Sequence, residues 1–466
     1  MDRKYKHLLK DTAIFAIGSL GSKAILFFMV PLYTNYLSTA EYGTADLVAV
    51  FSALIIPVVS LSIEKAVIRF GMKRDVSKEQ VLLSAAFVSV CAIAATVCIM
   101  PLLGFYQAIS EWRVYLAAHI ILSVIAEIER AYLKMKDLNK AFSMIGICQT
   151  VVLALANVLL LTVFRMGVKG YLISNILSVL SSVILCFFVG RIYQDLRGVR
   201  INWALLRQMI RYAAPLILSG ISWWILHASD KVMIEWLVGA SVLGIYTAAT
   251  KLPSLIHVII GIFNQAWGLS SIRETETDNA QGYYASVFDR FSFVLFGAGI
   301  VFIALSKPFM RIYVGQAFQE SWKYTPFLLF AAVFYALFSF MGSIYAALQR
   351  TVNDMRLSFL CACLNILINY FGIKQYGASG AVIGTAVSYF VTAAISIFDI
   401  RKYVRFEINL KRYAVHSVLL FMAAWSVTFS DFYVIISFIC IGFFFLENRQ
   451  TIQRLYAWAK TIRKAR

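Results

Sequence analysis

Long apolar runs separated by short polar breaks are the feature that most constrains this chain. Of its 466 residues, 61% are hydrophobic and 14% are charged, whereas soluble globular proteins have roughly 45–50% and about 25%. The surplus apolar surface must face lipid. Because lipid offers the backbone no hydrogen-bond partner, and the runs lack the alternating pattern of barrel strands, we expect helices throughout.

The runs predict an all-α polytopic membrane protein with about 14 transmembrane helices. Between the runs, the longest polar stretches, 191–211 and 271–290, are too short for a soluble domain. The predicted spans are 11–36, 45–68, 81–105, 113–133, 141–164, 170–190, 209–236, 243–267, 288–310, 324–348, 356–372, 378–400, 412–429 and 432–446.

The net charge of +19 is explained by where the basic residues lie. Of the 43 lysines and arginines, 33 fall in alternate polar segments that include both termini, and only 7 fall in the segments between those. Basic residues collect on the cytoplasmic side of a membrane protein. This distribution predicts a multi-pass protein of the cell inner (cytoplasmic) membrane with both termini in the cytoplasm, and it leaves no support for nucleic-acid binding.

No pattern of catalytic or metal-binding residues is present. The seven cysteines all lie in predicted spans and lack the spacing of metal ligands, which favours buried, inert thiols. The sequence has neither a nucleotide-binding loop nor a cluster of acids with metal spacing. We therefore expect no enzyme, no catalytic residues, no metal and no cofactor.

An internal repeat organises the chain. Residues 37–43 (LSTAEYG) connect the first two predicted spans, and residues 238–244 (VGASVLG) connect the seventh and eighth, at an offset of 201. Six spans separate the copies, so both halves enter the membrane in the same orientation, related by a pseudo-two-fold axis along its normal. The predicted organisation is a six-helix lobe at 1–193, a second at 194–403, and two further helices with a basic cytoplasmic tail at 404–466.

Several short motifs resemble the polysaccharide biosynthesis flippases, the Wzx-like branch of the multidrug/oligosaccharidyl-lipid/polysaccharide exporter superfamily. The resemblance covers roughly residues 8 to 400. Its motifs are Pro31-Leu32-Tyr33-Thr34, Leu37-Ser38-x-x-Glu41-Tyr42-Gly43, Tyr212-Ala213-Ala214-Pro215, Asp230-Lys231-Val232-Met233-Ile234, Gly244-Ile245-Tyr246 and Ala266-Trp267.

The resemblance implies a MATE-like fold and a flippase function. The expected substrate is an undecaprenyl-diphosphate-linked oligosaccharide, moved from the cytoplasmic to the periplasmic leaflet for surface polysaccharide synthesis. The family is thought to work by alternating access around a cationic cavity. The expected partners are this substrate, membrane lipids and a polysaccharide polymerase of the same pathway.

Two lysines are candidate contacts for the diphosphate. Lys23 lies about twelve residues into the first span, roughly 18 Å deep. An ammonium there cannot easily reach either interface, so it should face water. Lys251 lies about eight residues, or roughly 12 Å, from the outer end of the eighth span. For each, an interior ion pair or a packing role is the alternative.

Two more basic residues have simpler explanations beside a functional one. Arg69, near the cytoplasmic end of the second span, is a candidate for catching the arriving phosphate or an ordinary positive-inside anchor. Lys231 is followed by Glu235 one helical turn later and preceded by Asp230, which favours a local ion pair.

Polar amides and tryptophans inside the spans are candidates for the sugar path. Asn365 and Asn369 share one helix face and are candidate sugar contacts, although hydrogen bonds between helices explain such amides equally well. Tryptophans at 223, 224 and 267 are suited to stacking on sugars, or to packing and the membrane interface.

His227, Asp230 and His257 are the set that most resembles a proton relay for ion coupling. A buried histidine titrates near neutral pH, and an acid one turn away is able to exchange a proton with it. Ordinary packing is the alternative.

Three other functions compete with the flippase. A multidrug or cation exporter of the same superfamily would carry acidic groups deep in its first lobe, whereas the deep charge of the first span is Lys23. A lipid II flippase is compatible with the same residues. A membrane glycosyltransferase or polymerase is disfavoured, because the longest outer loop, near 307–323, has no acid/base pair.

Overall fold

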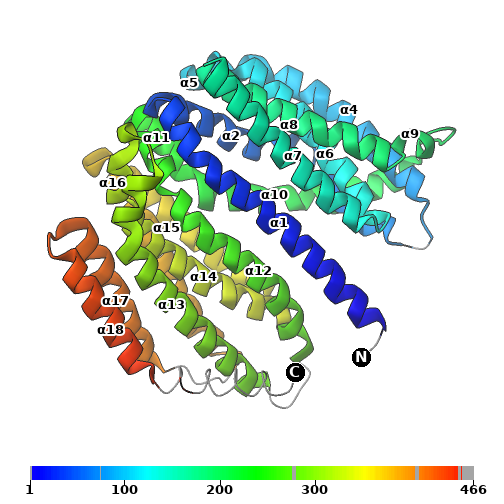
Figure 1. Ribbon diagram of the computed structural model, residues 1–466. Coiled ribbons are helices and arrows are strands. Elements are labelled where there is room, and N and C mark those ends of the chain that lie inside the picture. The colour runs from blue at the N-terminus through cyan, green and yellow to red at the C-terminus, as the bar shows by residue number, and fades with distance from the viewer. Residues whose placement is uncertain (1–2, 74, 275–279, 405–408, 450–452, 454–466) are drawn as a thin grey trace. The chain divides into compact units, whose positions relative to one another are not determined.

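A computed structural model describes residues 3–73, 75–274, 280–404, 409–449 and 453 (Figure 1). These residues form helices joined by short turns, and they include no strand. Nine helices are long and apolar enough to cross a membrane, or ten when a bent pair is counted as one span, among the residues described. The all-α, polytopic fold class is confirmed, and the count of about 14 spans stays a prediction.

The chain divides into two compact units, Met1–Thr247 and Ala248–Arg466. In the first unit, α1 packs on α7, and α7 lies beside α8 (Figure 1). The helices of this unit are α1 (Arg3–Tyr36), α2 (Thr39–Val59), α3 (Ile63–Gly71), α4 (Lys78–Leu103), α5 (Gln107–Ser110), α6 (Arg113–Met135), α7 (Asn139–Asn157), the π-helix η1 (Val158–Val163), α8 (Gly167–Val189), α9 (Ile192–Asp195), α10 (Trp203–Leu237) and most of α11 (Ala240–Ala249).

In the second unit, α14 packs against α12, α13, α16 and α17, and it is the most buried of the candidate spans. The helices are α12 (Lys251–Glu274), α13 (Ala280–Tyr313), the 3-10 helix η2 (Gln316–Lys323), α14 (Thr325–Ala347), α15 (Thr351–Tyr376), α16 (Ala378–Ile400), α17 (Leu410–Phe429) and α18 (Tyr433–Glu447). The division into lobes at 1–193, 194–403 and 404–466 stays a prediction. Most of the basic tail lies outside the described residues.

All fourteen predicted spans coincide with helix, but two of them are broken. The span at 45–68 is interrupted between α2 and α3, where Leu61 and Ser62 have φ of 54° and 50°. The span at 243–267 bends by 47° between α11 and α12. The left-handed conformation costs an ordinary residue roughly 1–2 kcal/mol, so the break between α2 and α3 is a specific feature of the fold.

The two copies of the repeat meet within the first unit. A Cβ on Gly43 would lie 2.1 Å from the carbonyl oxygen of Ala240, and a Cβ on Gly244 would lie 1.9 Å from the carbonyl oxygen of Thr39. Both residue pairs are related by the offset of 201, so each contact is the image of the other. The start of α2 and the start of α11 therefore touch backbone to backbone about a local two-fold axis, and only glycine permits this approach.

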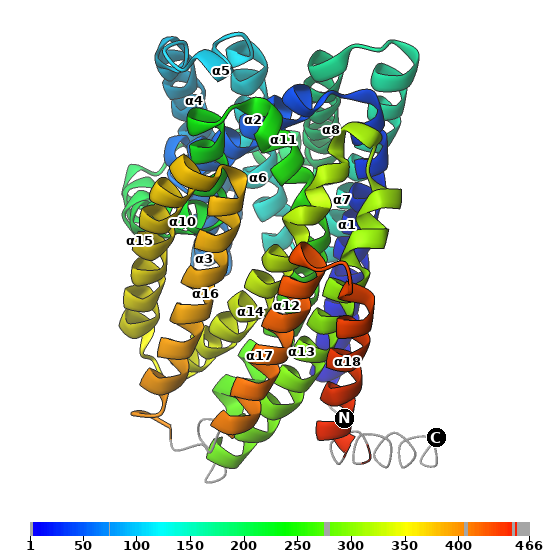
Figure 2. The same ribbon diagram turned by 90° about the vertical axis from the view of Figure 1, so that its left-hand side faces the viewer.

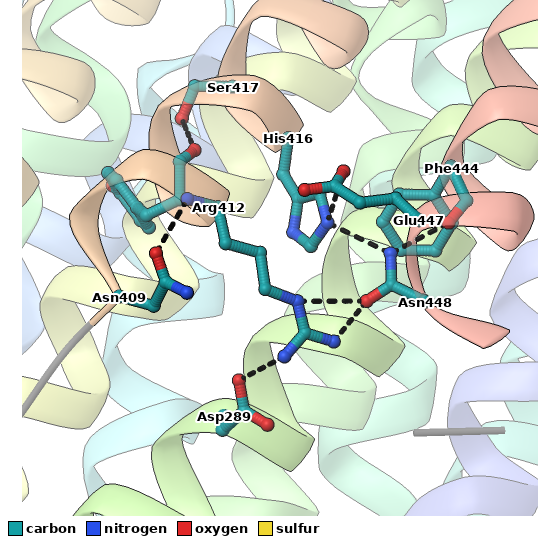
Figure 3. A network of polar contacts seen from close by, with 9 residues as sticks. Asp289, Asn409, Arg412, His416, Ser417, Phe444, Glu447 and Asn448 are labelled. Carbon is teal, nitrogen blue, oxygen red and sulfur yellow. Dashed lines mark hydrogen bonds and ion pairs between the residues drawn. The ribbon is translucent and has the colours of Figure 1, made fainter. Parts of the chain in front are cut away.

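Helices α17 and α18 form a hairpin that packs on α13 in the second unit (Figure 2). A polar network fastens it (Figure 3). Arg412 on α17 pairs with Asp289 on α13 at 2.8 Å and donates to Asn448, which follows α18. The Asn448 amide lies 2.9 Å from the ring nitrogen of the buried His416. Charged and amide groups placed this way hold the last two helices to the rest of the unit.

Candidate functional site

A buried ion pair joins α2 to α10 in the first unit. The ammonium of Lys231 lies 2.7 Å from a carboxylate oxygen of Asp46, and their side chains are only 16% and 13% exposed. Thr247 donates to the same carboxylate oxygen at 3.0 Å. Asp46 and Thr247 are again 201 residues apart, so this contact also lies at the meeting of the repeats. The pairing neutralises Lys231 and removes it from the candidates for anion binding.

The local ion pair predicted for Lys231 and Glu235 is wrong, because both residues have partners elsewhere. Glu235 accepts a hydrogen bond from the hydroxyl of Tyr106, in the loop before α5. Burial and this carboxylate raise the pKa of the Tyr106 hydroxyl. Asp230 accepts from the Tyr246 hydroxyl and from the backbone N–H of Lys231.

A groove of about 480 Å³ opens between α2, α3, α6 and α10 of the first unit. Its polar lining includes Glu64 and Lys65 on α3 and Glu127 on α6. Trp223 on α10 also lines it and is 58% exposed. Charged groups at this position cannot face acyl chains at low cost, so the groove is expected to hold water or a polar ligand.

Two buried oxygens at the groove have no hydrogen-bond partner within the described part of the chain. They are the Oγ of Ser62, which is fully buried, and one carboxylate oxygen of Glu64. Both residues stand at the break between α2 and α3, with Ser62 immediately before α3. Because buried polar atoms are rarely left unpaired, these two distinguish the break between α2 and α3 from an ordinary packed turn.

The structure places Lys23 on the exposed surface of α1. Among the residues that the structure describes, no acidic side chain pairs with it. Neighbouring Ser22 donates to the carbonyl of Gly146 on α7, which fixes this part of α1 on the unit. The contacts of Lys23 with water and with phosphate both stay predictions.

The other predicted phosphate contacts occupy helix ends. Arg69 is exposed in the last turn of α3. Lys251 is half-buried and begins α12, directly after the 47° bend. The roles of both residues stay predictions.

The paired amides hold α15 to α16. Asn369 and Asn365 are buried, and the Asn369 amide donates to the Asn365 oxygen at 2.9 Å. The Asn365 amide in turn lies 3.3 Å from the hydroxyl of Thr385 on α16. This geometry gives them the helix-pairing role that was the alternative, and a contact with sugar stays a prediction.

The three members of the predicted relay have different surroundings. The ring of His227 on α10 lies 4.7 Å from the ring of Trp223. In the second unit, the ring of His257 on α12 lies 4.9 Å from that of Tyr335. Asp230 bonds to Tyr246, as described above. Their role in ion coupling stays a prediction.

The charged residues of α6 were not placed in the protein interior by the sequence analysis. They lie close together near the end of a predicted span, which is the usual position of a cytoplasmic anchor. Glu129 is only 6% exposed. Arg130 donates to the Ser182 hydroxyl on α8 at 2.9 Å and to the side-chain oxygen of Gln149 on α7. Two polar residues on neighbouring helices thus accommodate a charge that the sequence analysis placed in a cytoplasmic segment.

Comparison with known proteins gives the chain a family. The model of the family described as polysaccharide biosynthesis protein matches residues 8–267. A Haemophilus influenzae protein described as Lsg locus putative protein 1 is 23% identical over 264 residues, which are 56% of this chain and 64% of that protein. The chain thus matches less than two-thirds of this relative's length.

Solved transporter structures share the fold. A structure described as lipid II flippase MurJ in an inward closed conformation has a TM-score of 0.70 at 13% identity, covering 94% of this chain and all of that one. An outward-facing multidrug resistance MATE family transporter has a TM-score of 0.60 at 12% identity, covering 84% and 95%. A transporter from Pyrococcus furiosus, whose structure is described by the reversed polarity of its binding pocket, has a TM-score of 0.61 at 14% identity over similar shares.

These similarities confirm the MATE-like fold of a multi-pass membrane protein. The family model covers more than half of the chain, including the motifs at 31–43 and 212–246. The predicted Wzx-like membership is therefore confirmed, and this protein belongs to the polysaccharide biosynthesis protein family.

Proposed function

We propose that this protein is a flippase that moves an undecaprenyl-diphosphate-linked oligosaccharide from the cytoplasmic to the outer leaflet by alternating access. Family membership supports a role in making polysaccharide, and the transporter fold supports movement rather than synthesis. The proposal includes location in the inner membrane, both termini in the cytoplasm, and a polymerase that receives the product.

The observation that supports the proposed substrate is which lysines of the first unit have an acidic partner. Lys231 is neutralised by Asp46, whereas Lys23 is exposed on α1 without an acidic partner among the described residues. A lysine without a carboxylate partner has its ammonium available to a ligand. A lipid diphosphate carries the matching negative charge, and Lys251 and Arg69 are the proposed further contacts.

Two alternatives have specific support. Glu64 and Glu127 line the groove of the first unit, which is the acidic feature expected of a cation exporter. The similarity to a structure described as a lipid II flippase favours a related cargo with the same diphosphate chemistry. The proposed substrate is an anion, whereas a cation exporter moves a cation. It differs from lipid II in its sugar.

Expression of this chain in a strain that lacks its own oligosaccharide flippase tests the proposal. We expect surface polysaccharide to return and the lipid-linked precursor that accumulates inside the mutant to fall to the parental level. Lipid extracts and surface staining measure both, with membrane amounts matched by immunoblot. A strain that gains resistance to cationic dyes but still accumulates precursor would instead support the cation exporter, and rescue of a strain lacking its lipid II flippase would support the other alternative.

A further inference from the structure

The groove at the break between α2 and α3 has mixed polarity. Glu64 and Glu127 offer carboxylate acceptors, Lys65 offers an ammonium donor, and Ser219 adds a hydroxyl. A simple organic cation would use the carboxylates and be repelled by the ammonium. A ligand with many hydroxyl groups both donates and accepts, so it satisfies every group of this lining.

The unpartnered oxygens show where such a ligand would bind. Ser62 Oγ is fully buried and lines the groove, and one oxygen of Glu64 beside it also lacks a partner among the described residues. Leaving either oxygen unpaired destabilises the fold. Leu61 and Ser62 both have a left-handed backbone at this break, and Ser62 lines the groove.

Sugar-binding sites combine hydrogen-bonding groups with an aromatic ring, and a tryptophan provides that ring in the groove. Trp223 lines the groove and is 58% exposed, whereas its neighbour Trp224 is committed to packing through a 2.7 Å hydrogen bond from its indole N–H to the Val50 carbonyl. An exposed aromatic ring beside carboxylates offers an apolar face to C–H groups while the acids bind hydroxyls. The volume of about 480 Å³ lies within the usual range for small-molecule sites, roughly 300–1,000 Å³.

We propose that this groove is a sugar subsite, in which Trp223 stacks on one sugar unit of the glycan and Glu64, Glu127 and Ser62 bind its hydroxyl groups. The inference rests on the proposed function and adds a place where the glycan itself is recognised, separate from the lysines that bind the diphosphate. It assigns selection among glycans to the first unit.

Binding of the lipid-free glycan tests the subsite. The probe is the repeat-unit oligosaccharide of the host polysaccharide, released from its lipid by mild acid, and titrated calorimetrically into the purified full-length chain. Trp223→Ala is expected to weaken binding by about tenfold or more, and Trp223→Phe, which keeps an aromatic ring, to restore most of it. Glu64→Gln and Glu127→Gln should each weaken binding by about tenfold, because charge-assisted hydrogen bonds are lost.

Trp236→Ala is the matched control, because Trp236 is equally exposed on the same helix but does not line the groove. Size-exclusion profiles establish that each variant is folded. Equal binding of the glycan by the wild type and Trp223→Ala, or no binding by the wild type, would overturn the subsite. In that case, binding of the intact lipid-linked glycan would leave the proposed function standing. Binding of tetraphenylphosphonium that is lost in Glu64→Gln, without binding of either glycan, would overturn both.

Discussion

Replacing Lys23 with alanine is expected to reduce glycan export to the level of a strain without flippase, although the protein still inserts. The lysine is exposed on α1, and no acidic side chain pairs with it among the described residues. Removing the charge removes its attraction for the diphosphate. The measurement is surface polysaccharide per amount of membrane-inserted protein in the complemented strain.

Two further variants distinguish the effect of the positive charge on export from the effect of its position in the protein. Lys23→Arg keeps the positive charge and should retain a large part of the export. Lys374→Ala removes an exposed lysine from the end of α15, where it donates to Tyr370, and should leave export unchanged. Full export by a Lys23→Ala/Lys251→Ala double variant would remove the proposed diphosphate contacts.

Gly244→Ala is expected to destabilise the protein by about 3 kcal/mol or more, although this substitution usually stabilises a helix. Alanine normally favours a helix over glycine by about 1 kcal/mol. Here the added Cβ would lie 1.9 Å from a backbone oxygen of Thr39, which cannot turn away as a flexible side chain does. The two helix starts would have to separate, and the Asp46 contact with Thr247 beside them would be disturbed.

Thermal unfolding of the detergent-purified protein measures this effect, and the repeat supplies a second case. Gly43→Ala should destabilise by a similar amount, since its Cβ would meet Ala240 at 2.1 Å. Gly442→Ala is the control, because a Cβ there meets nothing within 4 Å in α18, and it should be neutral or stabilising. Equal melting temperatures for all three variants would contradict the close contact of the two repeats.

The helices were predictable because burial of apolar side chains drives their formation, and the apolar runs can be located in the sequence alone. Each apolar run became helix, and the motif at 37–43 begins α2 through a reciprocal capping box between Ser38 and Glu41. The breaks were not predictable. Nothing in the residues around Leu61 and Ser62 requires a left-handed backbone, which is imposed by packing around them.

The candidate site was only partly predictable, because the partner of a charge depends on tertiary structure. Glu235 was the predicted partner of Lys231 because it lies one helical turn away. Lys231 instead pairs with Asp46, which is 185 residues away in the sequence. The repeat contained a usable signal: its offset pairs Asp46 with Thr247, which contact one another. The groove brings together Glu64, Glu127 and Trp223 from three helices, and no local pattern joins them.

Translocation by the purified protein is the decisive test of flippase activity. The chain is reconstituted into liposomes that carry a fluorescent polyprenyl-diphosphate-linked oligosaccharide, and a membrane-impermeant quencher reports how fast the glycan changes leaflet. We expect translocation well above that of protein-free liposomes and its loss with Lys23→Ala. If the glycan crosses no faster than in protein-free liposomes, while the same liposomes transport an organic cation, the protein is not an oligosaccharide flippase.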